Sequence, residues 1–181
     1  MDKIFQIGDF TFRLCCPDEI TPPPNFMLFE RGDTESVSGG GDAGEAEKPQ
    51  YTYRMHVASE LPEPEGKVIA SRPDLVVFEN ERGESRLIGV KGTEGYYACY
   101  QETSPDCAEI TFARDRIGGL HIDPVFSSLL ALERRLVKRD NIILHCAYVE
   151  YHGEAILFSA PSETGKTTQA NLWEKYRGSR T

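Results

Sequence analysis

Residues 160–168 read Ala-Pro-Ser-Glu-Thr-Gly-Lys-Thr-Thr, and this stretch decides how the C-terminal part of the chain folds. It fits the phosphate-binding loop pattern of Gly or Ala, four residues, and then Gly-Lys-Ser/Thr. Such a loop turns its backbone N–H groups toward phosphate oxygens, and the helix that follows adds the positive end of its dipole. The candidate nucleotide-binding residues are therefore Ala160, Pro161, Ser162, Glu163, Thr164, Gly165, Lys166, Thr167 and Thr168.

Three side chains of this loop carry specific expectations. Lys166 can reach the outer phosphates, and the Thr167 hydroxyl can ligate Mg²⁺, so the expected ligand is a magnesium nucleotide. Glu163 stands where many such loops carry Gly. A carboxylate beside phosphates is repulsive and a non-Gly residue resists positive φ, so Glu163 either points to solvent or weakens binding. The alternative for the whole motif is a plain strand–turn–helix connection whose Gly and Lys are incidental.

The sequence on both sides of the loop has the form that the motif requires. Before it, Ala155–Ser159 is an apolar run, which predicts a buried strand. After it, residues 168–176 carry apolar side chains at helical spacing, and Gly178 follows as a stop signal.

Composition excludes several classes of protein. The 181 residues include 29 acidic and 20 basic ones, and the net charge of −9 argues against a general nucleic-acid binder or a protein of anionic membrane surfaces. No apolar stretch approaches the ~20 residues that span a bilayer. The N-terminus lacks the basic and apolar regions of a signal peptide, and the five cysteines match no zinc pattern. We therefore expect a cytoplasmic protein with reduced thiols.

Residues 1–122 predict a β-rich region. A hairpin is expected within residues 3–16, and further alternating strands form an antiparallel meander, with an additional short strand at residues 25–30. Residues 31–50 are rich in Gly, Ser and acids, which predicts a flexible loop. The expected meander strands span residues 51–57, 75–78, 86–90, 96–100 and 108–112.

Residues 123–181 predict one helix followed by a hairpin and the loop. Asp123-Pro124 opens the helix as cap and first residue, and its apolar stripe continues to Val137. The basic residues near its end indicate a solvated helix terminus rather than a phosphate site. A strand at 142–151, a turn at His152-Gly153 and the strand into the loop should then pair antiparallel. The basic residues are Arg134, Arg135, Lys138 and Arg139.

The stretch Leu144 to Thr168, LHCAYVEYHGEAILFSAPSETGKTT, resembles the superfamily of HPr kinase/phosphorylase and phosphoenolpyruvate carboxykinase. Both groups carry a strand with His, a short turn, an apolar strand and then a phosphate loop. Residues 144–147, Leu-His-Cys-Ala, are similar to the Met-His-Cys-Ser-like start of the ATP-dependent carboxykinases. His145 precedes Lys166 by 166 − 145 = 21 residues, close to the spacing in both groups.

The resemblance implies a fold and a set of roles. The fold is α+β: a strand-rich N-terminal meander, one helix, and the strand–turn–strand–phosphate loop–helix of a carboxykinase-like P-loop domain. Lys166 would contact the β- and γ-phosphates of ATP, Thr167 would hold Mg²⁺, and His145 would stand near the transferred phosphoryl group. The alternative for His145 is a buried strand histidine whose nitrogens bond to the backbone.

The resemblance also implies an activity, which is that of an HPr-kinase-like enzyme acting on a Ser hydroxyl of a small protein or peptide. Family members often assemble, so a homo-oligomer is one expected state. They also continue past the loop helix into a strand that ends in Asp, whereas this sequence stops at Thr181. We therefore expect no transfer by this chain alone, with His145 and Lys166 as its catalytic candidates. The alternatives are a non-catalytic nucleotide-binding regulatory module, an inactive fragment, or an interaction domain.

Overall fold

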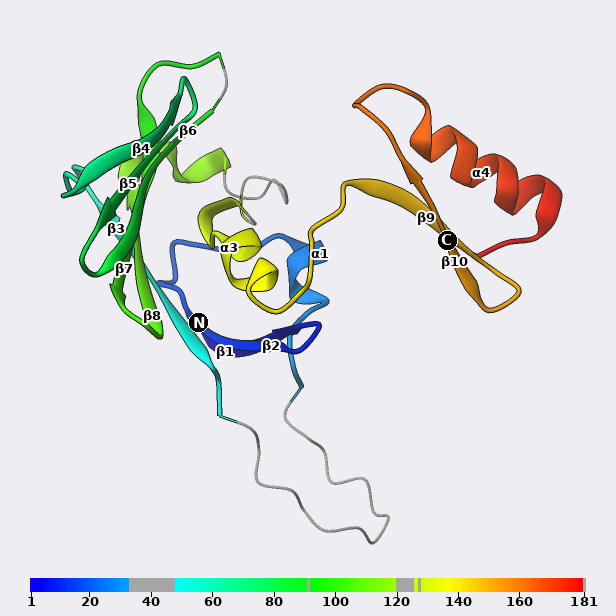
Figure 1. Ribbon diagram of the computed structural model, residues 1–181, viewed down its shortest axis with the longest axis horizontal. Coiled ribbons are helices and arrows are strands. Elements are labelled where there is room, and N and C mark those ends of the chain that lie inside the picture. Colours follow the sequence, from blue (N-terminus) through cyan, green and yellow to red (C-terminus); the bar gives the residue numbers. More distant parts are fainter. Residues whose placement is uncertain (33–47, 91, 120–125, 127, 181) are drawn as a thin grey trace, which may run out of the picture. The chain divides into compact units, whose positions relative to one another are not determined.

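The computed structural model describes residues 1–32, 48–90, 92–119, 126 and 128–180. The chain is a mixed α+β protein with a strand-rich sheet and few helices, as expected (Figure 1). It divides into two compact units, Met1–Asp140 and Asn141–Thr181, rather than at the expected boundary between residues 122 and 123. Most of the loop expected at 31–50, and the helix start expected at Asp123-Pro124, lie outside the described residues.

The first unit contains an eight-stranded sheet in the order β1-β2-β3-β8-β7-β6-β5-β4. The expected N-terminal hairpin is confirmed as β1 and β2, and β4 to β8 form an antiparallel meander. The strands are β1 (Asp2–Ile7), β2 (Phe10–Cys15), β3 (Tyr51–Ala58), β4 (Lys67–Arg72), β5 (Leu75–Asn80), β6 (Gly83–Gly89), β7 (Tyr96–Ser104) and β8 (Cys107–Ala113).

The expectation of a wholly antiparallel sheet is wrong at β3, which runs parallel to both β2 and β8. Long connections precede and follow β3 instead of two-residue turns, and such connections permit parallel pairing. Strand β4 was not expected at all. It lies at the sheet edge with all six residues exposed, so it lacks the alternation that marks a half-buried strand.

Residues 25–30 do not form the additional strand that we expected. Pro24–Met27 is a short helix, α1, and Pro24 occupies its first position, where a missing N–H costs nothing. This turn buries Phe26, whose ring lies 5.0 Å from that of Phe5 and 4.8 Å from that of Phe126. Figure 1 shows α1 and α3 (Leu132–Val137) inside the curve of the sheet, where this aromatic core lies.

The long helix expected up to Val137 is interrupted. Residues 126, 128 and 129 are helical, a turn follows at Leu130-Ala131, and α3 begins only at Leu132. Ala131 has φ 46°, in the left-handed region. The three consecutive residues Leu129, Leu130 and Ala131 are fully buried, which one face of a continuous surface helix cannot achieve. A 3-10 helix, η1 (Arg114–Gly119), completes the unit.

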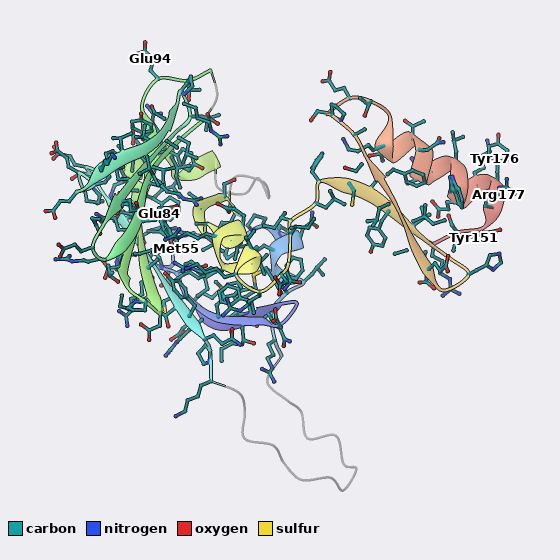
Figure 2. The ribbon with its side chains drawn as sticks, viewed as in Figure 1. Met55, Glu84, Glu94, Tyr151, Tyr176 and Arg177 are labelled. Carbon is teal, nitrogen blue, oxygen red and sulfur yellow. The ribbon has the colours of Figure 1, made fainter. Side chains whose placement is uncertain are left out.

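Arg134 and Arg135 are not part of a solvated helix end, whereas Lys138 at the C-cap of α3 is exposed, as expected. Arg135 is 7% exposed; it donates to the Tyr51 hydroxyl at 2.7 Å and to the Glu102 carboxylate. Arg134 Nε lies 2.8 Å from Glu102 Oε1, and its Nη1 lies 3.1 Å from Glu84, which Figure 2 labels. These ion pairs attach α3 to the sheet, which explains why the first unit extends to Asp140.

The pKa of the Glu102 carboxyl is lowered in this network. Burial alone raises it, but the hydrogen bond from Arg134, the backbone N–H of Glu84 and the charge of Arg135 together outweigh burial. The folded state therefore holds Glu102 as a carboxylate.

The second unit consists of β9 (Cys146–Tyr151), β10 (Glu154–Ser159) and α4 (Lys166–Arg177). The two strands pair antiparallel across His152-Gly153, as expected, and both turn residues have positive φ, which fits a tight hairpin. Trp173 packs on the strands, and its ring centroid lies 5.5 Å from that of Tyr151 and 6.0 Å from that of Phe158.

None of the described helices is long and apolar enough to cross a membrane. All five cysteines are free thiols.

Candidate phosphate-binding site

The candidate loop connects the end of β10 to the start of α4. Gly165 caps the helix with φ 87°, a conformation that glycine adopts without the steric cost of a Cβ atom. Its carbonyl accepts the first helical hydrogen bond, from Gln169 N at 2.9 Å. The Thr164 hydroxyl braces the loop by donating to the Pro161 carbonyl at 2.7 Å. The helix therefore begins at Lys166, with the first-turn N–H groups free of intrahelical acceptors.

Lys166 spans the loop. Its ammonium group donates to the carbonyl oxygens of Ala160 and Pro161, both at 2.9 Å. In the part of the chain that the structure describes, Lys166 forms no ion pair, so carbonyl dipoles rather than a carboxylate offset its charge. A phosphate group can replace these two neutral acceptors with a stronger, charge-assisted contact.

The loop borders an open cavity of about 400 Å³. Three of the nine candidate residues do not line it: Ala160 and Pro161 supply the carbonyls for Lys166, and Thr164 braces the turn. The remaining candidates of the loop do line it, together with the catalytic candidate from the start of the hairpin. The lining residues are His145, Ser162, Glu163, Gly165, Lys166, Thr167 and Thr168.

His145 lies directly before β9 rather than within a strand, because β9 begins at Cys146 and not at Ile142. Its side chain is exposed, so the alternative of a buried strand histidine is wrong. Its carbonyl accepts a long hydrogen bond of 3.5 Å from the Ser159 hydroxyl at the end of β10. The hairpin thus places the imidazole beside the loop, and both line the same cavity.

Glu163 also lines this cavity, with its backbone at φ 64°. A left-handed conformation costs a non-glycine residue roughly 1 kcal/mol or more. Glu163 forms no ion pair or hydrogen bond with any other described residue. The loop therefore carries one cation and one unpaired carboxylate at its cavity.

The oxygen atoms available here suit a hard cation. The Thr167 hydroxyl and the Glu163 carboxylate line one cavity, and Mg²⁺ prefers such ligands, completed by phosphate oxygens and water. No group of three or more His, Cys, Asp or Glu side chains gathers within the described ranges. The described residues that line the cavity could thus contribute part of a magnesium coordination shell.

A second cavity, of about 530 Å³, lies in the first unit and was not foreseen. Its charged lining residues are paired with one another: Arg72 Nε lies 3.0 Å from Asp74, and Arg86 contacts Glu133. No local sequence signal announced it, because its residues come from four separate segments. Its charges are compensated, and it offers no uncompensated cation like Lys166.

Comparisons with known proteins add no assignment. No protein-family model, no curated protein and no solved structure matches the chain. The functional argument therefore rests on the loop, its cavity and the side chains that line it.

Proposed function

We propose that the second unit binds the phosphates of ATP, together with Mg²⁺, through residues 160–168. The observation that carries this proposal is the position of Lys166. Its ammonium is held between two loop carbonyls at a cavity that also contains Gly165 and Thr167. A cation beside unpaired first-turn N–H groups favours an anion.

Each part of the loop has a proposed task. Lys166 exchanges its carbonyl partners for β- and γ-phosphate oxygens, while the first N–H groups of α4 hold the remaining oxygens. The Thr167 hydroxyl is the protein's ligand to Mg²⁺, which neutralises phosphate charge. The succession β9, turn, β10, loop and α4 supports a carboxykinase-like P-loop arrangement as part of the proposal.

Phosphoryl transfer to a Ser hydroxyl of a small protein or peptide is the second candidate. The observation in its favour is that His145 lines the same cavity as Lys166 and Thr167. Transfer, however, also needs a positioned base and a metal held by more than one ligand. Among the described residues Glu163 is the only carboxylate that lines the cavity. We therefore propose nucleotide binding without turnover for the chain as it stands.

The proposal also covers the partners, the cellular location and the oligomeric state of the protein. A nucleotide is the primary partner, and nucleic acid and anionic membrane surfaces are disfavoured by the net charge of −9. A cytoplasmic location is supported by the five free thiols. The unpaired outer edge of β10, within the described residues, supports self-association as the route to a homo-oligomer.

Calorimetric titration with Mg-ATP tests the binding proposal. We expect saturable binding by the wild type, and Lys166→Ala should weaken it by roughly 10- to 100-fold, because a charge-assisted contact is lost. Lys175→Ala is the matched control: it removes the same charge from the last turn of α4, away from the cavity. Equal affinities for wild type and Lys166→Ala would contradict the proposal.

A further inference from the structure

The unpaired carboxylate of Glu163 is the feature of the loop that phosphate binding does not explain. It lines the cavity with Lys166 and Thr167, and it forms no ion pair or hydrogen bond with any other described residue. Its backbone holds a left-handed conformation that a glycine would adopt without strain. Strain of this kind at a ligand cavity points to a task for the side chain.

The charges of the cavity determine what that task can be. Lys166 and Glu163 carry opposite charges, so these two side chains together give the cavity no net positive charge. A triphosphate without metal would place its full negative charge beside the Glu163 carboxylate, in an open site where water and salt only partly screen the repulsion. A bound divalent cation cancels two of those charges and can itself accept the carboxylate as a ligand.

We propose that Glu163 makes phosphate binding by this loop depend on a divalent cation, so that the loop selects a metal–triphosphate complex and rejects the metal-free polyanion. This inference rests on the proposed nucleotide binding and adds a specificity-determining residue to it. Glu163 acts either as a direct cation ligand, beside the Thr167 hydroxyl, or through the field of its charge.

The test compares the affinity for ATP in excess Mg²⁺ with the affinity for ATP in excess chelator, both measured at the same pH and ionic strength. For the wild type we expect binding of Mg-ATP and much weaker binding of metal-free ATP. Glu163→Gln removes the charge but keeps the side-chain size. The change should tighten the binding of metal-free ATP by roughly tenfold. This is the size of effect expected when a carboxylate is removed several ångströms from phosphate charges in a solvated site.

If Glu163 acts through the field of its charge, the same variant should tighten the binding of Mg-ATP by no more than about threefold, because the complex carries about half the negative charge. If Glu163 ligates the cation directly, the variant should weaken the binding of Mg-ATP. The ratio of the two dissociation constants therefore falls by about threefold or more. Glu174→Gln, on α4 outside the cavity, changes the net charge equally and should leave the ratio unchanged. Melting by circular dichroism verifies that both variants are folded.

The outcomes separate this inference from the one on which it rests. If the wild type binds Mg-ATP and the Glu163→Gln variant shows the same metal dependence, the proposed role of Glu163 is overturned and nucleotide binding stays intact. An equal shift in Glu174→Gln also overturns it, because the effect would then come from overall charge. Absence of Mg-ATP binding by the folded wild type overturns both.

Discussion

Replacing Glu102 with Gln should destabilise the first unit more than any surface change. The carboxylate accepts hydrogen bonds from Arg134 Nε at 2.8 Å and from Arg135. It also accepts the Tyr100 hydroxyl at 3.2 Å and the backbone N–H of Glu84 at 3.1 Å. Both Glu102 and Arg135 are less than a tenth exposed, so loss of the charge leaves a guanidinium buried without its main partner. Breaking such a pair costs about 3–5 kcal/mol.

The assay is urea unfolding followed by far-UV circular dichroism at neutral pH. Glu109→Gln on β8 is the matched control, because Glu109 belongs to the same sheet and forms no ion pair with another described residue. It should change the free energy of unfolding by no more than about 0.5 kcal/mol. If Glu102→Gln matches this control, the network does not attach α3 to the sheet and the reasoning is refuted.

The stability contributed by the Glu102–Arg135 pair depends on pH because the pKa of Glu102 is lowered. Because the folded pKa lies below the ordinary value of 4.5, the stabilisation is fully present above pH 4.5. It is lost as the pH falls through the folded pKa, where the carboxyl becomes protonated. The unfolding free energies of wild type and Glu102→Gln should therefore converge in acid, and a constant difference down to strongly acidic pH would contradict this account.

Two further predictions concern local conformation and burial. Gly165→Ala and Gly178→Ala, both at positive φ, should each cost about 1 kcal/mol of stability in thermal melts, but only the former should weaken Mg-ATP binding. If both variants lost the same affinity for Mg-ATP, backbone strain rather than the place of Gly165 in the loop would explain the loss. Burial raises the pKa of Cys16 and of Cys99 to about 12. Both thiols should therefore resist alkylation at neutral pH until the chain unfolds. Cys146 is only half-buried and should be labelled in the native state. Mass spectrometry of labelled peptides checks this order.

Local sequence signals predicted the elements of the second unit well, but the expected burial of Ala155–Ser159 is wrong, because every residue of β10 is exposed or half-buried. The turn at His152-Gly153, the loop and the helix stop at Gly178 are encoded by residues adjacent in sequence, and all three lie where expected. His145 lies outside a strand because β9 starts at Cys146, four residues after the predicted start at Ile142. Its place at the cavity followed from hairpin pairing, which a local pattern can predict.

The first unit shows where such reasoning fails. The parallel pairing of β3 depends on partners distant in sequence, which alternation alone does not identify. Nothing local marks Ala131 as left-handed. Arg135 resembles any basic residue at a helix end, and only the facing Glu102 and Tyr51 make its burial favourable. The Glu163 carboxylate was recognised from sequence, but its position at the cavity required the structure.

Amide chemical-shift mapping by two-dimensional NMR during a Mg-ATP titration tests the central claim most directly. The account predicts saturable shifts for residues 160–168 and for His145, with the largest at Gly165, Lys166 and Thr167, and none that saturate in the strands of the first unit. The same titration of Lys166→Ala should lose most of these shifts. Saturable shifts that appear elsewhere and spare residues 160–168, or no shifts for folded protein at millimolar Mg-ATP, would contradict phosphate binding by this loop.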